Sequence, residues 1–94
     1  MEYDAFSKSI TAAEPPQDLN QYALSLWWDA KGDWQQAHTI IQDMEDINAA
    51  WIHAYLHRKE GDTGNAGYWY NRAGKKMPQS TLQEEWKEIL QSVL

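Results

Sequence analysis

The sequence predicts an all-α fold, built from two consecutive antiparallel helix hairpins and closed by a C-terminal helix. Apolar residues recur at spacings of three and four in successive segments, which is typical of helices with one buried face. No segment alternates between polar and apolar residues for long enough to form a strand. A Gly-Asp pair with Ala four residues after the Asp occurs at Gly32 and again at Gly61. This repeat predicts two similar hairpins that stack on each other.

The first hairpin is expected over residues 18–46. Its first helix spans about 19–31, with Asp18 as the predicted N-cap. Gly32 follows this helix, where a left-handed residue commonly ends a helix. Asp33 is then placed to cap the second helix, because its carboxylate can accept a backbone N–H of the first turn.

The second hairpin is expected over residues 47–78, with its two helices joined at Gly61. The C-terminal helix is expected over residues 80–94, where Ser80 and Gln83 have the spacing of a capping box. Its apolar stripe predicts a helix that packs on the hairpins.

Residues 1–17 form the remaining, leading segment. The positions of Tyr3, Phe6 and Ile10 allow a short amphipathic helix there. A chain of 94 residues is one domain by length.

Composition excludes several classes of protein. The net charge of −6 argues against a nucleic-acid-binding protein, which needs a basic surface. The absence of cysteine excludes disulfides and thiolate metal sites. No apolar run is long enough to cross a bilayer, and the N-terminus does not have the pattern of a signal peptide. We therefore expect a cytoplasmic protein that does not bind membranes.

The second hairpin resembles the tetratricopeptide repeat (TPR) family. The matching positions are Ala54, Gly61-Asp62, Ala66, Tyr70, Ala73 and Pro78. The spacing of 29 residues between the two Gly-Asp pairs is shorter than the family's usual repeat of about 34 residues. The resemblance covers about residues 18–78, and it implies that the C-terminal helix is a capping helix. Segments 26–34, 53–58 and 68–74 also resemble a family of short uncharacterised microbial proteins, which implies no activity.

In the TPR family, the first helices of the hairpins line a concave face that binds peptides. Aromatic side chains with an arginine are typical of interaction hot spots. Carried over by position, this face consists of Tyr22, Leu26, Asp29, Asn48, Trp51, Tyr55 and Arg58. The resemblance implies a non-catalytic adaptor or small-assembly subunit, whose partner is a protein, a peptide or a second copy of the chain. The alternative is that the aromatic residues pack in the core.

A second hypothesis is a small-molecule or metal-binding protein, or an enzyme, that uses the histidines. His53 and His57 are four residues apart and share one helix face, and His38 lies on the preceding antiparallel helix. Three imidazoles suit Zn²⁺. Ala54 stands where a zinc-protease helix carries its glutamate, so that motif is absent. The alternative is a structural role, with the three side chains hydrogen-bonded to their neighbours.

No other pattern indicates catalysis. The sequence has no glycine-rich phosphate loop and no nucleophile elbow, and we predict neither a catalytic residue nor a cofactor.

Five basic residues lie near the C-terminal ends of the third and fourth predicted helices, where they complement the helix dipole. They are Arg58, Lys59, Arg72, Lys75 and Lys76.

Overall fold

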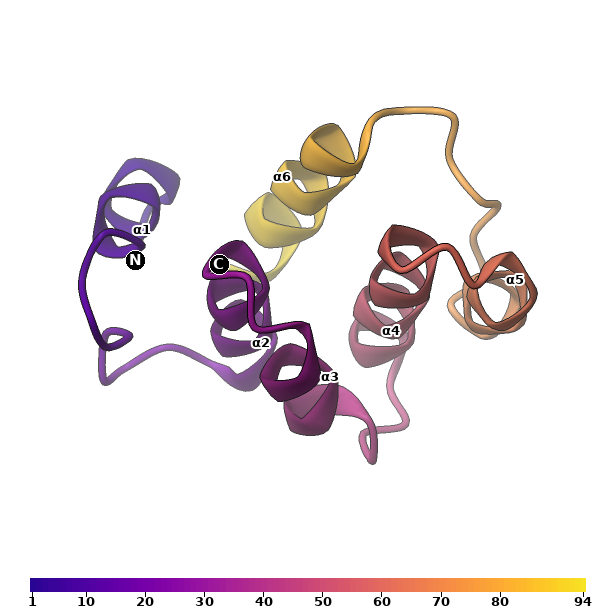
Figure 1. The fold of residues 1–94 in the computed structure, drawn as a ribbon, viewed down its shortest axis with the longest axis horizontal. Coiled ribbons are helices and arrows are strands. Elements are labelled where there is room, and N and C mark those ends of the chain that lie inside the picture. Colours follow the sequence, from indigo (N-terminus) through magenta and orange to yellow (C-terminus); the bar gives the residue numbers. More distant parts are fainter.

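The computed structural model describes residues 1–94 and contains six helices and no strand, which confirms the all-α prediction (Figure 1). The helices are α1 (Tyr3–Ser9), α2 (Gln21–Ala30), α3 (Trp34–Ile41), α4 (Ile47–Lys59), α5 (Thr63–Arg72) and α6 (Leu82–Val93). None of them has both the length and the apolar character that a membrane span requires.

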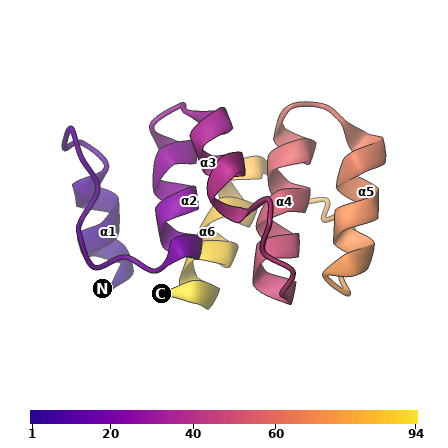
Figure 2. The same ribbon diagram turned by 90° about the horizontal axis from the view of Figure 1, so that it is seen from below.

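Helices α1 to α5 stand side by side in chain order, and neighbours from α2 to α5 alternate in direction (Figure 2). The closest pairs are α2 with α3 and α4 with α5, which are the two predicted hairpins. Helix α6 returns across the row and packs on both α2 and α4 (Figures 1 and 2). The C-terminal helix therefore covers the side of the hairpins that their first helices share.

The two Gly-Asp pairs form the hairpin turns as the sequence predicts. Gly32 and Gly61 have φ angles of 87° and 86°, a left-handed conformation that glycine adopts without steric strain. Asp33 and Asp62 follow and accept the backbone N–H three residues further on. Each pair thus ends one helix and begins the next, through interactions that are local in sequence.

The predicted N-cap of the first hairpin is wrong. Helix α2 begins at Gln21, and its N-cap is Asn20 rather than Asp18. The Asn20 side chain accepts the Ala23 N–H at 2.8 Å and donates through Nδ2 to the Val93 carbonyl at the end of α6. An amide can make both bonds, whereas a carboxylate only accepts.

The predicted N-cap of α6 is also displaced by one residue. Thr81, not Ser80, caps the helix, and Glu84 completes the capping box in place of Gln83. The Ser80 carbonyl accepts a hydrogen bond from the Arg58 guanidinium instead. Ser80, two residues before α6, thus contacts α4 through its backbone, and Thr81 takes the N-cap position.

One core cluster draws apolar residues from all six helices. Phe6 of α1 is fully buried, and its ring centroid lies 6.0 Å from that of Trp86 in α6. Trp27 of α2 is also fully buried and donates to the Ser9 hydroxyl at 3.2 Å. The leading segment therefore forms a short helix that packs on α2 and α6.

Candidate functional site

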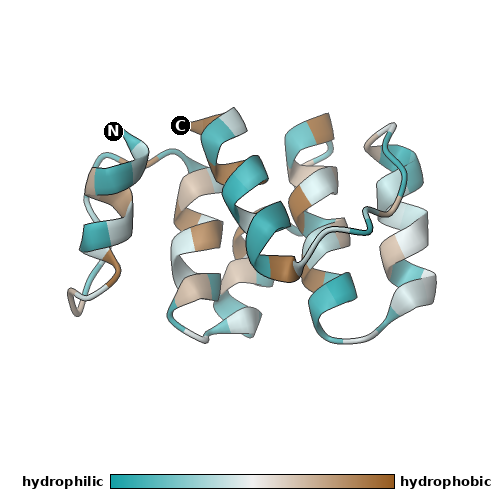
Figure 3. Cartoon of the chain, turned by 90° about the horizontal axis from the view of Figure 1, so that it is seen from above, coloured by the Kyte–Doolittle hydropathy of each residue, from teal (hydrophilic) through white to brown (hydrophobic).

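The predicted partner-binding residues lie on α2 and α4, and α6 covers most of them. Leu26, Asp29, Trp51 and Tyr55 are buried. The Arg58 side chain is 17% exposed. The side of α6 that faces away from the hairpins is hydrophilic (Figure 3). In this structure the chain's own C-terminal helix thus occupies the face on which the sequence places a partner.

Glu85 of α6 anchors this contact. Its carboxylate is fully buried and accepts hydrogen bonds from the Arg58 guanidinium at 2.8 Å and from the Tyr70 hydroxyl at 2.6 Å. The Trp51 indole N–H donates at 3.2 Å to Oε2, the same oxygen that the Tyr70 hydroxyl bonds at 2.6 Å, whereas Arg58 bonds Oε1. Burial, and then the Glu85 carboxylate, raise the pKa of Tyr70. A buried carboxylate with this many donors has its hydrogen-bonding capacity used within the fold.

A second polar cluster lies at the C-terminal ends of α2 and α4. The buried Asp29 carboxylate accepts a hydrogen bond from the Tyr55 hydroxyl and another from the Lys59 ammonium, both at 2.9 Å. Burial, and then the charge of Asp29, raise the pKa of Tyr55. Tyr55 therefore stays a neutral hydroxyl donor, and the positive charge of Lys59 balances the negative charge of the Asp29 carboxylate.

This second cluster opens into a cavity of about 500 Å³, which is bounded by α1, α2, α4 and α6. Its polar lining includes Asp29, Tyr55 and Lys59, and its apolar lining includes Tyr3, Ile10 and Trp86. The cavity could not be predicted from the sequence, because Tyr3 and Ile10 come from the leading segment and Trp86 comes from α6. Periodicity showed that these segments are amphipathic but did not show where they pack.

Two further predicted partner-binding residues, Tyr22 and Asn48, line neither the cavity nor the Glu85 network. The Tyr22 hydroxyl donates to Asp46 at 2.7 Å, and this hydrogen bond raises the pKa of Tyr22. Asn48 is half-buried in the first turn of α4. Neither side chain lines the cavity, so the structure divides the predicted face into separate parts.

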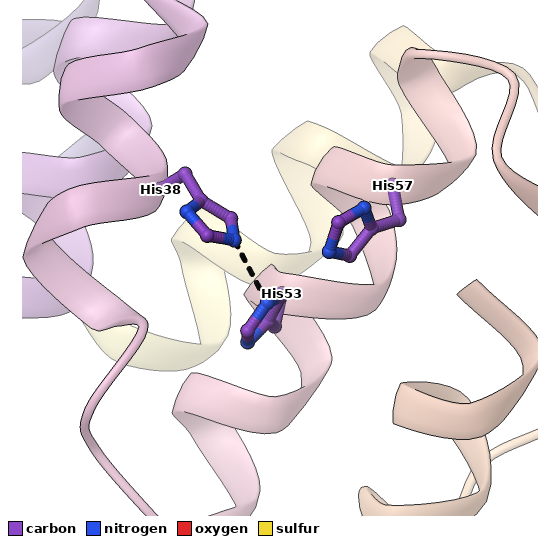
Figure 4. Close-up of side chains that lie close together, drawn as sticks. All are labelled: His38, His53 and His57. Atoms are coloured by element: carbon purple, nitrogen blue, oxygen red, sulfur yellow. Dashed lines mark hydrogen bonds between the residues drawn. The ribbon is translucent and has the colours of Figure 1, made fainter. Parts of the chain in front are cut away.

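The three histidines come together between α3 and α4, outside the cavity (Figure 4). One ring nitrogen from each of His38, His53 and His57 lies within 4.8 Å of the other two. The Nε2 atoms of His38 and His53 are 2.9 Å apart. The stacked hairpins therefore bring His38 to the pair on α4, as the antiparallel arrangement predicts.

Burial keeps two of these imidazoles neutral. It lowers the pKa of His53 to about 4, with further contributions from His38, His57 and Arg72. Burial also lowers the pKa of His38. At neutral pH each of these two rings therefore carries one N–H and one lone pair.

Two tryptophans hold the histidine rings in place. The Trp34 ring stacks on His38 with centroids 4.9 Å apart and planes 12° apart. The Trp69 ring stacks on His53 with centroids 3.8 Å apart and planes 14° apart. This arrangement uses two of the chain's six tryptophans around one polar cluster.

Four of the five basic residues make side-chain contacts within the fold. Arg58 and Lys59 pair with buried carboxylates, as described above. Arg72 lies 5.0 Å from the centroid of the Trp69 ring, and Lys75 lies 3.9 Å from the centroid of a Trp51 ring. These are cation–π distances. These four residues are therefore distributed among separate contacts rather than gathered at one.

Comparison with known proteins identifies no relative of this chain. No protein-family model matches it, and neither does any curated protein or solved structure. The functional interpretation of the candidate sites therefore rests on their geometry.

Proposed function

We propose that the chain is a non-catalytic protein-interaction module that binds a segment of a partner protein at the cavity between α1 and α6. The observation that carries this proposal is that Asp29 and Tyr55, two residues of the predicted face, line the cavity. Trp51 and Arg58 of that face bond to Glu85 of α6 instead, so the cavity is the place where residues of the predicted face border an opening.

The lining suits a peptide segment with mixed character. Tyr3, Ile10 and Trp86 offer contacts to one apolar side chain of the partner. The Lys59 side chain is 38% exposed and still has donors beyond its bond to Asp29. We therefore expect the partner segment to present an apolar side chain close to a carboxylate.

The experiment fills the cavity without disturbing the network around Glu85. Ser7 on α1 lines the cavity, and Ser7→Trp places a large side chain there. Ala5 lies on the exposed side of the same helix, so Ala5→Trp is the matched control. Substitution of Trp51 or Arg58 is less informative, because both residues hold α6 in place.

Random peptides displayed on phage are selected against the wild-type chain, and the dissociation constants of the selected peptides are measured for all three proteins. Folding of each variant is checked by circular dichroism. We expect Ser7→Trp to weaken binding at least about tenfold, since filling the cavity removes the partner's contacts, and Ala5→Trp to leave it unchanged. Failure to select any peptide, or equal binding to both variants, would contradict the proposal.

A further inference from the structure

The histidine cluster has the ligands of a metal site that is independent of the cavity. The chain has three histidines, and all of them are in this cluster. His38 belongs to the first hairpin, whereas His53 and His57 lie one helical turn apart on the second (Figure 4). A bound ion would therefore join the two hairpins.

The distances between the ring nitrogens fit a small divalent ion. Zn²⁺ binds imidazole nitrogens at about 2.0–2.1 Å in tetrahedral sites, which places two ligand nitrogens about 3.3 Å apart. The His38 and His53 nitrogens are 2.9 Å apart, and all three residues have a ring nitrogen within 4.8 Å of the others. Small rotations of the rings would bring the three nitrogens to the distances that Zn²⁺ requires.

A carboxylate orients the third ring. Glu60 Oε1 lies 2.7 Å from His57 Nδ1, which leaves Nε2 of His57 as the free ligand atom. Metal-binding histidines commonly donate their second ring N–H to a carboxylate in this way, which fixes the tautomer and makes the ring a stronger ligand. Asp62 lies close to His57 and Glu60, so the negative charges of two carboxylates would stabilise a bound cation.

The cluster lacks the saturated hydrogen bonding expected of structural histidines. His38 Nδ1 is buried and has no hydrogen-bond partner. The hydrogen bonds of the cluster engage His38 Nε2, His53 Nε2 and His57 Nδ1, which are half of its ring nitrogens. Buried polar atoms in proteins are nearly always hydrogen-bonded, and the exceptions are often functional.

We propose that His38, His53 and His57 bind one divalent transition-metal ion of the Zn²⁺ type through a ring nitrogen from each residue. Zinc sites with three protein ligands keep a fourth position open for water or another ligand. The half-buried His38 gives the ion a route from solvent. Glu60 is a positioning residue that acts through His57.

The first test uses the untagged wild-type chain, so that the three native histidines are the only imidazoles present. Zn²⁺ binding is measured by calorimetry, and Co²⁺ is used as a spectroscopic probe of ligand geometry. We expect one ion per chain with micromolar or tighter affinity, and visible Co²⁺ bands of tetrahedral intensity. The absence of stoichiometric Zn²⁺ binding at neutral pH would overturn the proposal, and so would an octahedral Co²⁺ spectrum.

Variants test which residues bind the ion. His38→Gln removes a half-buried ligand, and Gln36→Ala changes an exposed residue of the same helix. We expect His38→Gln to reduce the Zn²⁺ affinity more than about 100-fold, since a direct ligand exceeds the effect of an outer partner. The control should bind like the wild type. Unchanged binding by a folded His38→Gln variant would exclude His38 as a ligand.

A substitution of Glu60 tests the positioning role separately. Glu60→Gln should lower the Zn²⁺ affinity by roughly 10- to 100-fold while keeping one ion per chain, because the neutral amide orients His57 less strongly. Glu88→Gln, at an exposed position of α6, is the charge-matched control. Equal affinities for these two variants would refute the role of Glu60. Peptide binding at the cavity uses different residues, so its outcome is independent of these measurements.

Discussion

Two of the molecule's buried polar clusters, the one at Glu85 and the three histidines, differ in how far their hydrogen bonds are satisfied. At Glu85, donors from Arg58, Trp51 and Tyr70 converge on one carboxylate. In the histidine cluster, half of the ring nitrogens have no protein partner. A saturated buried network contributes to the stability and uniqueness of a fold, whereas an unsaturated one retains capacity for a ligand. Burial alone therefore does not distinguish a structural cluster from a binding site.

The largest expected effect comes from removing the carboxylate at the centre of the saturated cluster. Glu85→Ala would leave the Arg58 guanidinium without its buried counter-charge, and we expect a loss of about 3–5 kcal/mol in the free energy of unfolding. Urea denaturation measures this loss. Glu88→Ala, on the exposed side of the same helix, should cost less than about 0.5 kcal/mol. Similar losses for the two variants would show that the Glu85 network is not what holds α6.

A smaller effect is expected when one donor to Glu85 is removed. Tyr70→Phe deletes the hydroxyl that lies 2.6 Å from the carboxylate and should destabilise the fold by about 1.5–3 kcal/mol, because the bond is to a charged group. Tyr68 is 54% exposed on the same helix, so Tyr68→Phe is the matched control and should be nearly neutral. A neutral Tyr70→Phe would mean that the remaining donors saturate Glu85 without this hydroxyl.

The histidine cluster should make stability depend on pH. The pKa of His53 falls from its ordinary 6.5 to about 4 on folding, and that of His38 is also lowered. Between about pH 4 and pH 6.5, the unfolded chain therefore binds more protons than the folded chain. The neutral histidines contribute fully to the free energy of unfolding above about pH 6.5. As the pH falls towards 4, the free energy of unfolding decreases by an amount on the order of 1–2 kcal/mol.

Urea unfolding in metal-free buffer between about pH 7 and pH 5 measures this dependence. The groups that face His53 are His38 on α3, His57 on α4 and Arg72 on α5, and all three oppose its protonation. His53→Gln should flatten the profile, since it removes the group with the most strongly lowered pKa. An equally steep profile in this variant would assign the pH dependence to other residues.

The sequence predicts the parts of this structure that depend on local interactions. The Gly-Asp turns form because each glycine ends the preceding helix and each aspartate caps the following one, and both interactions are local in sequence. The spacing of His53 and His57 likewise predicts that they share a helix face, and the hairpin order predicts that His38 lies nearby.

The remaining features depend on packing between distant segments. Helix α6 is amphipathic, but its pattern does not reveal that Glu85 is buried against α4 and α5. The cavity forms only when α1 meets α6, which local periodicity cannot show. Asn20 is similarly the N-cap of α2 while also bonding to the end of α6, a contact between residues 73 positions apart.

The smallest expected effect concerns the start of α6 and separates the two clusters. Thr81→Ala removes the hydroxyl that accepts the Glu84 N–H at 3.0 Å, and we expect a loss of about 1 kcal/mol. Ser80→Ala is the control, because Ser80 contributes its carbonyl and not its side chain. Helix α6 covers the Glu85 cluster and is remote in sequence from the histidines. The changes in amide chemical shift between Thr81→Ala and the wild type should therefore concentrate around Trp51 and Tyr70. Shifts of equal size around His38 would show that α6 and the histidine cluster are coupled, and the two clusters would then have to be treated as one unit.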